Sequence, residues 1–176
     1  EETTEVTVTA TWNGPFEIPS NYASAKWYTV AIHKTYESNN YIWKYDGSSK
    51  VTTKTLATDD YATLSNNNLF AFVGNPYDGF TIYNQTAGSS LKLTRADDQV
   101  TEATMGETAT LFVPKASSVG TIANGYFCLQ PKDGTNYVNM QDIDGDAGTA
   151  KLLGWDENDS GSTCWVISPG QYYLDF

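Results

Sequence analysis

Few side chains in this sequence have the types and spacing that enzyme chemistry requires. Nucleophilic hydrolysis needs a base beside a serine or cysteine, and the only histidine is His33, at the end of an apolar run. No Gly-x-Ser-x-Gly elbow, phosphate-binding glycine loop or Cys-x-x-Cys pair occurs. The 21 acidic residues offer many carboxylate pairs, but their spacing singles out none as a glycosidase pair. We therefore expect no enzymatic activity and no cofactor.

One acidic loop contains the residue types that bind calcium. It reads Asp142-Ile143-Asp144-Gly145-Asp146, and Ca²⁺ prefers several such oxygens. The EF-hand pattern fails, because the glycine is at the wrong position and Leu153 stands where a bidentate glutamate belongs. We interpret the loop as an acidic turn and predict no metal site.

Aromatic residues beside carboxylates are the other chemistry that the sequence offers. Trp155 is followed by Asp156, and Trp43, Tyr45 and Asp46 lie within four positions of one another. A sugar site needs an aromatic ring for the apolar face of the sugar and Asp, Asn or Gln for its hydroxyls. These residues therefore favour carbohydrate binding, although each aromatic is also suited to a half-buried strand.

The charge of the chain excludes one class of partner. The formal net charge is -11, and the 10 basic residues are scattered singly, whereas a phosphate backbone requires clustered Lys and Arg. The sequence contains no apolar run of about 18 residues, so we expect no membrane-spanning segment. An acidic surface of this kind suits neutral ligands and argues against nucleic acid.

The chain is divided into short alternating segments by frequent turn signals, and no sustained helical stripe occurs. Three segments open alike, with inward residues expected at Tyr28/Phe80/Tyr126 and at Val30/Ile82/Cys128. Each also closes alike, at residues 69–73, 110–113 and 163–167. Two further short strands lie between each opener and closer. The pattern predicts an all-β fold of three repeats with about four strands each.

A single unit of this size cannot bury its apolar face, so the copies must pack on one another. Three copies can close into a barrel with a cap of hairpins, which removes exposed sheet edges. A β-sandwich with chance similarity between its hairpins is the alternative. We expect an N-terminal strand or linker at 1–23 and one domain at 24–176, with repeats at approximately 27–73, 79–114 and 125–168.

The repeat pattern resembles the ricin-B-like β-trefoil modules of secreted and surface proteins from Bacteroidetes. The resemblance covers roughly residues 24 to 168, and it is carried by the closer and opener Asn68-Leu69-Phe70-Ala71-Phe72-Val73-Gly74 to Gly79-Phe80-Thr81-Ile82. The usual Gln-x-Trp closer of the lectins is absent, and we expect Phe70, Leu111 and Cys164 in the place of its aromatic residue. The resemblance implies a β-trefoil of a secreted, periplasmic or cell-surface protein.

The same resemblance implies where a sugar would bind. In ricin-like trefoils each unit can hold one shallow site on its second and third strands. In this sequence the third unit offers the most suitable side chains and the first offers a smaller set: Asp142, Asp144, Trp155, Asp156 and Asn158, and then Trp43, Tyr45 and Asp46. Trp155 is the residue that we would test first, although it also fits a core position.

Cys128 and Cys164 are the two cysteines, and the repeat alignment places both inward on the first and last strands of one unit. A disulfide between them requires Cα atoms within about 7 Å, and two buried thiols are the alternative.

The sequence is compatible with three functions. The leading one is a non-catalytic carbohydrate-binding module. The second is a protein-interaction or protease-inhibitor-like trefoil that uses an exposed loop at 57–68 or 101–108. The third is a structural spacer that joins neighbouring domains of a longer surface protein.

Overall fold

The chain forms an all-β structure with short 3₁₀ helices. The computed structural model describes residues 12, 14, 16–33, 40–56, 64–117, 122, 127–156 and 165–169, with the backbone alone for 56 and 166–169. The 3₁₀ helices are η1 (Tyr22–Ser24) and η3 (Asn66–Asn68). Within the described ranges, no helix has the length and apolar character needed to cross a membrane.

Within the described residues, twelve strands fall into three consecutive units of four. The first unit contains β1 (Tyr28–Ile32), β2 (Asn40–Tyr45), β3 (Val51–Leu56) and β4 (Phe70–Asn75). The second contains β5 (Gly79–Asn84), β6 (Lys92–Thr94), β7 (Thr104–Gly106) and β8 (Phe112–Ala116). The third contains β9 (Phe127–Pro131), β10 (Tyr137–Asp144), β11 (Thr149–Trp155) and β12 (Trp165–Pro169).

The first and last strands of the units form a closed barrel. Within the units they meet at the pairs Tyr28↔Phe70, Phe80↔Phe112 and Phe127↔Trp165. Between the units, β4 pairs with β5, β8 with β9, and β12 with β1. The ring closes on itself, so these strands leave no free edge. The three predicted repeats are confirmed, with the same two aromatic positions in each unit.

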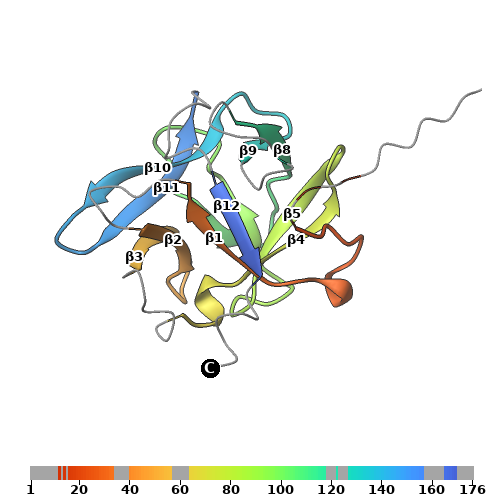
Figure 1. Cartoon of the computed structure of the whole chain (residues 1–176), viewed down its shortest axis with the longest axis horizontal. Coiled ribbons are helices and arrows are strands. Elements are labelled where there is room, and N and C mark those ends of the chain that lie inside the picture. The colour runs from red at the N-terminus through yellow and green to blue at the C-terminus, as the bar shows by residue number, and fades with distance from the viewer. Residues whose placement is uncertain are drawn as a thin grey trace, which may run out of the picture.

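The middle strands of each unit form a hairpin, and the three hairpins are joined by backbone hydrogen bonds. Val51 N donates to Ala103 O at 3.0 Å, and Ala103 N donates to Leu152 O at 2.9 Å. Strand β11 also pairs with β3. The β10–β11 hairpin projects sideways from the barrel (Figure 1). The predicted cap of hairpins is therefore present, and its third hairpin is the most prominent.

The repeat alignment differs from the predicted one by one residue at several places. Phe112 is fully buried whereas Leu111 is 42% exposed, so Phe112 is the closing residue of the second unit. Trp165 closes the third unit in place of Cys164, and Phe127 opens it in place of Tyr126. Every closing position therefore holds a buried aromatic ring, which the predicted alignment missed.

The corrected alignment moves Cys128 to the other face of β9. Phe127 and Leu129 belong to the barrel core, so Cys128 between them points away from it, although it is also buried. The predicted inward position of Cys128 is therefore wrong. Cys164 and Tyr126 lie outside the described residues, and a disulfide stays a prediction.

In the first two units, a polar side chain two positions before the closing aromatic residue connects the closer to its own unit. Asn68 Nδ2 donates to Trp43 O at 3.0 Å. In the second unit Arg95 N, directly after β6, donates to Thr110 Oγ1 at 3.0 Å. The polar–apolar–aromatic closer thus connects the closing strand to the hairpin that precedes it.

Phe16 fills the barrel where the three units begin. Its ring lies among Tyr28, Phe80 and Phe127, with centroid distances of 6.3, 6.3 and 5.1 Å. Trp12 packs on its outer side at 5.3 Å. Two hydrogen bonds hold this segment on the barrel. Glu17 N donates to the Tyr28 hydroxyl, and Gly74 N donates to Pro19 O. Phe16 and the residues that follow it therefore pack with the domain, whereas the sequence indicated a strand or linker before residue 24.

Candidate functional site

Two predicted platform residues of the first unit are core residues. Trp43 is 0% exposed and Tyr45 is 4% exposed. Trp43 packs edge-on against Phe70 and Trp165, at centroid distances of 5.4 and 5.2 Å. Neither ring has a face that a ligand can reach, so the prediction is wrong for both. Their inward direction follows from the alternation of β2.

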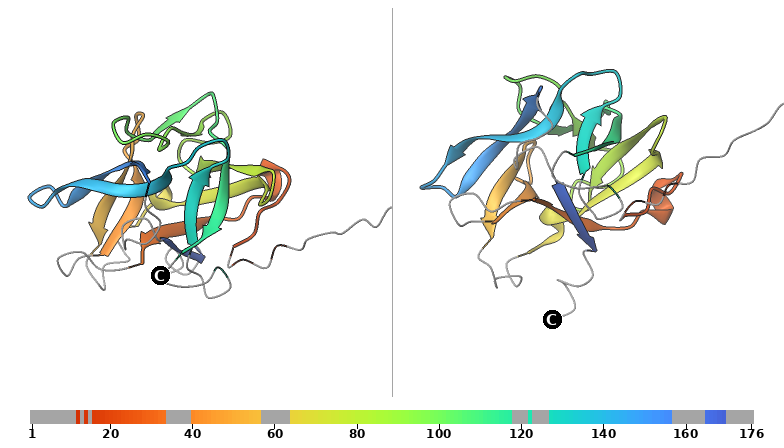
Figure 2. Two further views of the ribbon diagram at one scale, coloured as in Figure 1. Left: turned by 90° about the horizontal axis from the view of Figure 1, so that it is seen from above. Right: turned by 45° about the horizontal axis from the view of Figure 1, so that its top comes forward.

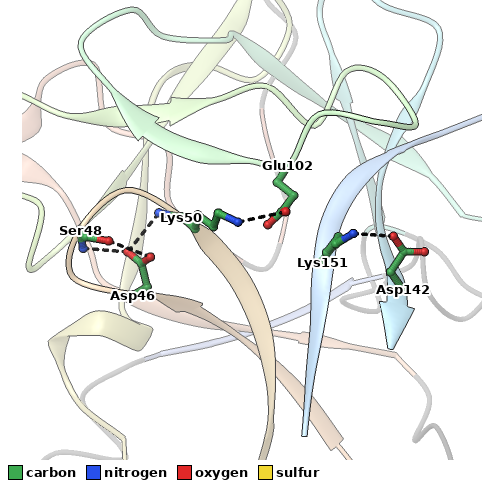
Figure 3. A network of polar contacts seen from close by, with 6 residues as sticks. All are labelled: Asp46, Ser48, Lys50, Glu102, Asp142 and Lys151. Carbon is green, nitrogen blue, oxygen red and sulfur yellow. Dashed lines mark hydrogen bonds and ion pairs between the residues drawn. The ribbon is translucent and has the colours of Figure 1, made fainter. Parts of the chain in front are cut away.

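Asp46 is exposed, but its carboxylate is used by its own turn. Asp46 Oδ1 accepts from the backbone N of Ser48, Ser49 and Lys50 at 2.7, 2.8 and 3.0 Å. Partial desolvation acts to raise the pKa of Asp46, but these hydrogen bonds outweigh it and the pKa is lowered. Asp46 therefore shapes the β2–β3 turn (Figure 3).

The predicted carboxylates of the third unit are likewise engaged. Asp142 Oδ2 accepts from Lys151 Nζ at 2.9 Å across the β10–β11 hairpin. This hydrogen bond and the charge of Asp142 raise the pKa of Lys151. Asp144 Oδ1 accepts from Ala147 N at 3.0 Å and so closes the hairpin turn. Both residues stabilise the tip of the hairpin.

A further ion pair joins two hairpins in the same region. Lys50 Nζ of the first unit lies 3.1 Å from Glu102 Oε1 of the second. Figure 3 shows this pair beside the pair formed by Lys151 and Asp142 of the third. Lys50 and Lys151 are therefore each paired with a carboxylate, and among the described residues no three metal-ligating side chains converge.

The β10–β11 hairpin separates the third-unit candidates. Asp144 pairs with Thr149 near the tip, whereas Trp155 pairs with Tyr137 at the base. The seven residue steps along the strand from Tyr137 to Asp144 correspond to a distance of roughly 20 Å. The predicted set is therefore not one site. Trp155 and Asp156 remain together at the base, and Asn158 lies outside the described residues.

The base of this hairpin holds a set of side chains that we call the hairpin-base surface: Tyr137, Asn139, Trp155 and Asp156. Tyr137 and Trp155 are register partners, so their side chains stand side by side on one face. Both are partly exposed, and Asp156 is exposed. Asn139 lies on the same face in the next pair, opposite Leu153. Sequence reasoning missed Tyr137 and Asn139, because only the register places them beside Trp155.

Asn139 has an unusual status within this surface. Its side chain is 3% exposed, and its Oδ1 atom has no hydrogen-bond partner among the described residues. A buried acceptor without a partner costs about 1–3 kcal/mol. Because this oxygen is itself inaccessible, a ligand hydroxyl can reach it only if the Asn139 side chain turns toward the surface.

A close backbone contact holds the base of the hairpin in place. A Cβ on Gly154 would lie 2.8 Å from the backbone of Asp97 and Asp98, and Gly154 N donates to Asp98 O at 2.6 Å. Asn136 Nδ2 donates to Asp97 O at 2.8 Å. Asp98 in turn accepts from the backbone N of Thr101 and Val100, which lowers its pKa. The second unit thus supports the face opposite to Trp155.

The other two hairpins lack an aromatic pair on their outward faces. The outward register pairs of β2–β3 whose side chains are both described are Ile42↔Lys54 and Lys44↔Thr52. Those of β6–β7 are Lys92↔Gly106 and Thr94↔Thr104. The hairpin-base surface is therefore specific to the third unit.

Two open depressions lie elsewhere on the described surface. One of about 630 Å³ is lined by Trp12, Glu17 and Tyr28 among others. The second, of about 370 Å³, is lined by residues that include Asp97 and Leu111. Neither is lined by Tyr137 or Trp155, so the hairpin-base surface is separate from both depressions.

Known structures share this arrangement of strands, although the sequence matches no protein-family model and no curated protein. A designed threefold-symmetric protein, ThreeFoil, is 8% identical, with 80% of this chain and 96% of that chain covered and a TM-score of 0.58. A ricin B-like lectin of Macrolepiota procera, solved in complex with lactose, is 12% identical, with 85% and 99% covered and a TM-score of 0.61. The fold is a β-trefoil. The SDF2-like protein of Arabidopsis thaliana is also similar, with 16% identity, 82% of this chain and 92% of that chain covered and a TM-score of 0.50.

These structural similarities establish the trefoil fold, and the function has to be argued from the side chains. The stretch at 101–108, considered above as an inhibitor loop, contains β7, which is paired with β6. In the other stretch, residues 57–63 lie outside the described residues and residues 66–68 form η3.

Proposed function

We propose that this trefoil is a non-catalytic carbohydrate-binding module of a secreted or cell-surface protein. The hairpin-base surface is its proposed binding site. The observation that carries the proposal is the partly exposed Tyr137–Trp155 pair next to the unpartnered Oδ1 of Asn139. A lectin with the same fold and bound lactose supports the class of ligand.

The chemistry of a sugar matches these side chains. The apolar face of a pyranose packs on an aromatic ring, while its hydroxyls need acceptors and donors nearby. A hydroxyl that donates to Asn139 Oδ1 removes the cost of leaving that oxygen unpaired. The exposed carboxylate of Asp156 offers a second acceptor at the rim.

The charge of the chain narrows the proposed ligand. With a net charge of -11, the protein repels anionic chains over several ångströms at low ionic strength. Neutral saccharides are not repelled by this charge. We therefore propose neutral sugars and not sulfated or sialylated ones.

A glycan array probed with the full chain, followed by calorimetric titration of each hit, tests the proposal. Trp155→Ala and Tyr137→Ala should each weaken binding at least about tenfold, which corresponds to about 1.4 kcal/mol. Tyr77→Ala is the matched control, since Tyr77 is 53% exposed on the distant β4–β5 turn and should leave binding unchanged. An array without hits, or equal affinity of the Trp155→Ala variant, would contradict the proposed function.

A further inference from the structure

A second group of partly exposed aromatic side chains lies on the wall of the barrel, and we call it the barrel-wall cluster: Tyr22, Trp27 and Tyr83. The ring of Tyr22 lies 4.9 Å from Tyr83 and 6.0 Å from Trp27, edge to face in both cases. Tyr22 belongs to η1, Trp27 directly precedes β1, and Tyr83 belongs to β5. Figure 2 shows the segment that contains η1 beside β4 and β5 in both views.

The register of the barrel strands explains why these rings meet. Tyr28 pairs with Phe70, and both point inward. Trp27 therefore lies on the outward face beside Ala71, whose register partner is Tyr83. Ala71 is fully buried, so it forms a small floor between the two larger rings. The ring of Tyr22 contacts both Trp27 and Tyr83 and so lies over these two rings.

The position of Tyr22 is fixed by a cap. Asn21 Oδ1 accepts from Ser24 N at 3.1 Å, which holds the single turn of η1 in place. The ring is thereby presented by a short, capped turn with no buried residues of its own. An aromatic surface of this kind is organised before any ligand arrives, which lowers the entropic cost of binding.

Gln85 adds a polar group with the same unusual status as Asn139. It follows Tyr83 by two residues and continues the same face, with its N donating to Leu69 O at 2.9 Å. Its Oε1 is buried and has no hydrogen-bond partner among the described residues. Four buried side-chain atoms have this status in the described part, and the two amide oxygens are those of Gln85 and Asn139.

We propose that the barrel-wall cluster, with Gln85, is a second binding site for neutral saccharides. This inference rests on the proposed function, because it assigns the same ligand chemistry to a different surface. The two sites belong to different parts of the trefoil, since one lies on the third hairpin and the other on the wall formed by β1, β4 and β5. A polymeric glycan can engage both at once, which raises its apparent affinity without any new contact.

Tryptophan side-chain NMR signals distinguish the two sites directly. Each site contains one tryptophan, Trp27 or Trp155, whereas Trp43 and Trp165 are fully buried and serve as internal references. We would titrate lactose, cellotetraose and mannotetraose, together with any array hit, into the ¹⁵N-labelled full chain. The expected result is a saturable shift of both the Trp27 and the Trp155 indole signals, with Trp43 and Trp165 unchanged.

Variants then separate the two sites. Trp155→Ala should retain the shift of Trp27, and Tyr22→Ala should retain the shift of Trp155 but weaken the Trp27 response at least about tenfold. Gln85→Leu, which leaves all three rings in place, should have the same effect as Tyr22→Ala. Tyr77→Ala is again the control, and the unchanged remaining signals show that each variant is folded.

The outcomes distinguish the inference from the function on which it rests. If the Trp155 signal shifts and Trp27 stays unchanged at saturation, the barrel-wall site is refuted and the proposed function stands. If Trp27 alone shifts, the inference is supported and the hairpin-base site is refuted. If no probe shifts either signal and the array is blank, both are refuted.

Discussion

Asp46, Asp142 and Asp144 are exposed carboxylates that look available in the sequence but are occupied in the fold. Asp46 accepts backbone hydrogen bonds from its own turn, Asp144 does the same at the hairpin tip, and Asp142 pairs with Lys151. Among the described residues, the buried side-chain oxygens without a hydrogen-bond partner belong to the amides of Asn139 and Gln85 and to the carboxylate of Asp97. At the scale of single residues, an unpaired buried acceptor is therefore a better guide to a binding site than an exposed acid.

Replacing Asn139 tests this view of buried acceptors. Asn139→Leu removes an unpaired oxygen from a strand interior and adds an apolar group of similar size. We expect the free energy of unfolding to rise by about 1 kcal/mol, while saccharide binding at the hairpin-base surface weakens. Urea denaturation and calorimetric titration on the same preparation measure both. A variant that is less stable, or that binds as well as the wild type, would show that Asn139 has only a structural role.

Asp46 predicts a specific dependence of stability on pH. Its pKa is lower in the folded than in the unfolded chain, where it is about 3.9, so its charged form favours the folded state. This contribution is complete above the unfolded pKa and is lost as the pH falls through the folded pKa. Asp46→Asn should therefore be less stable than the wild type near pH 7, and the difference should shrink near pH 3.

Urea midpoints at several pH values measure this difference. Asp78→Asn is a suitable control, because Asp78 is also exposed in a turn between strands and its variant lacks the same number of charges. A gap between wild type and Asp46→Asn that stays constant across the acid range would contradict the assignment.

The β10–β11 hairpin decides which third-unit residues can act together. Its length places the acidic tip far from the aromatic base, and its register brings Tyr137 beside Trp155. The base is fixed by the contact of Gly154 with Asp97 and Asp98. At the scale of elements, the site is thus made by strand pairing and not by nearness in the sequence.

Gly154→Ala tests the contact at the base. The added Cβ would meet backbone atoms at 2.8 Å, so we expect the free energy of unfolding to fall by about 1–3 kcal/mol. Gly145→Ala at the hairpin tip is the matched control, since no atom lies within 4 Å of its added Cβ. The control should change stability by no more than about 0.5 kcal/mol. Equal effects of the two variants in thermal or urea unfolding would refute the contact.

The strands also show how far the sequence alone could be interpreted. Three units, their strands and the closed barrel follow from repeated openers and closers. The register within them was off by one residue, because Leu111-Phe112-Val113 and Phe127-Cys128-Leu129 are apolar at every position. A period of two cannot be read from such runs, and a shift by one residue exchanges the faces. The prediction that Trp43 and Tyr45 are accessible was wrong for a related reason, because alternation alone does not say which side of a strand faces the core.

At the scale of the whole molecule, the three units share one residue that none of them supplies. Phe16 precedes the first unit and lies among the opening aromatic residues of all three. The threefold barrel is therefore completed by a single, unrepeated side chain. No repeat could indicate it, which explains why the segment resembled a linker in the sequence.

Phe16→Ala should destabilise the whole domain. Removing a ring that is 3% exposed leaves a cavity among five aromatic residues, and we expect a loss of about 3–5 kcal/mol in the free energy of unfolding. Phe16→Leu keeps most of the volume and should cost clearly less. Guanidinium unfolding followed by tryptophan fluorescence measures both. A loss below about 1 kcal/mol for Phe16→Ala would show that the barrel does not depend on this segment.

The position of Phe16 also sets an order of events during synthesis. Phe16 leaves the ribosome before the barrel rings that surround it, and Phe127, one of them, follows 111 residues later (127 minus 16). At about 5–20 residues per second, this delay lasts roughly 5–20 s. During that interval the nascent chain carries Trp12 and Phe16 without their complete receptor. This aromatic segment is thus made well before the barrel that shelters it, and it is a natural target for chaperones that act on growing chains.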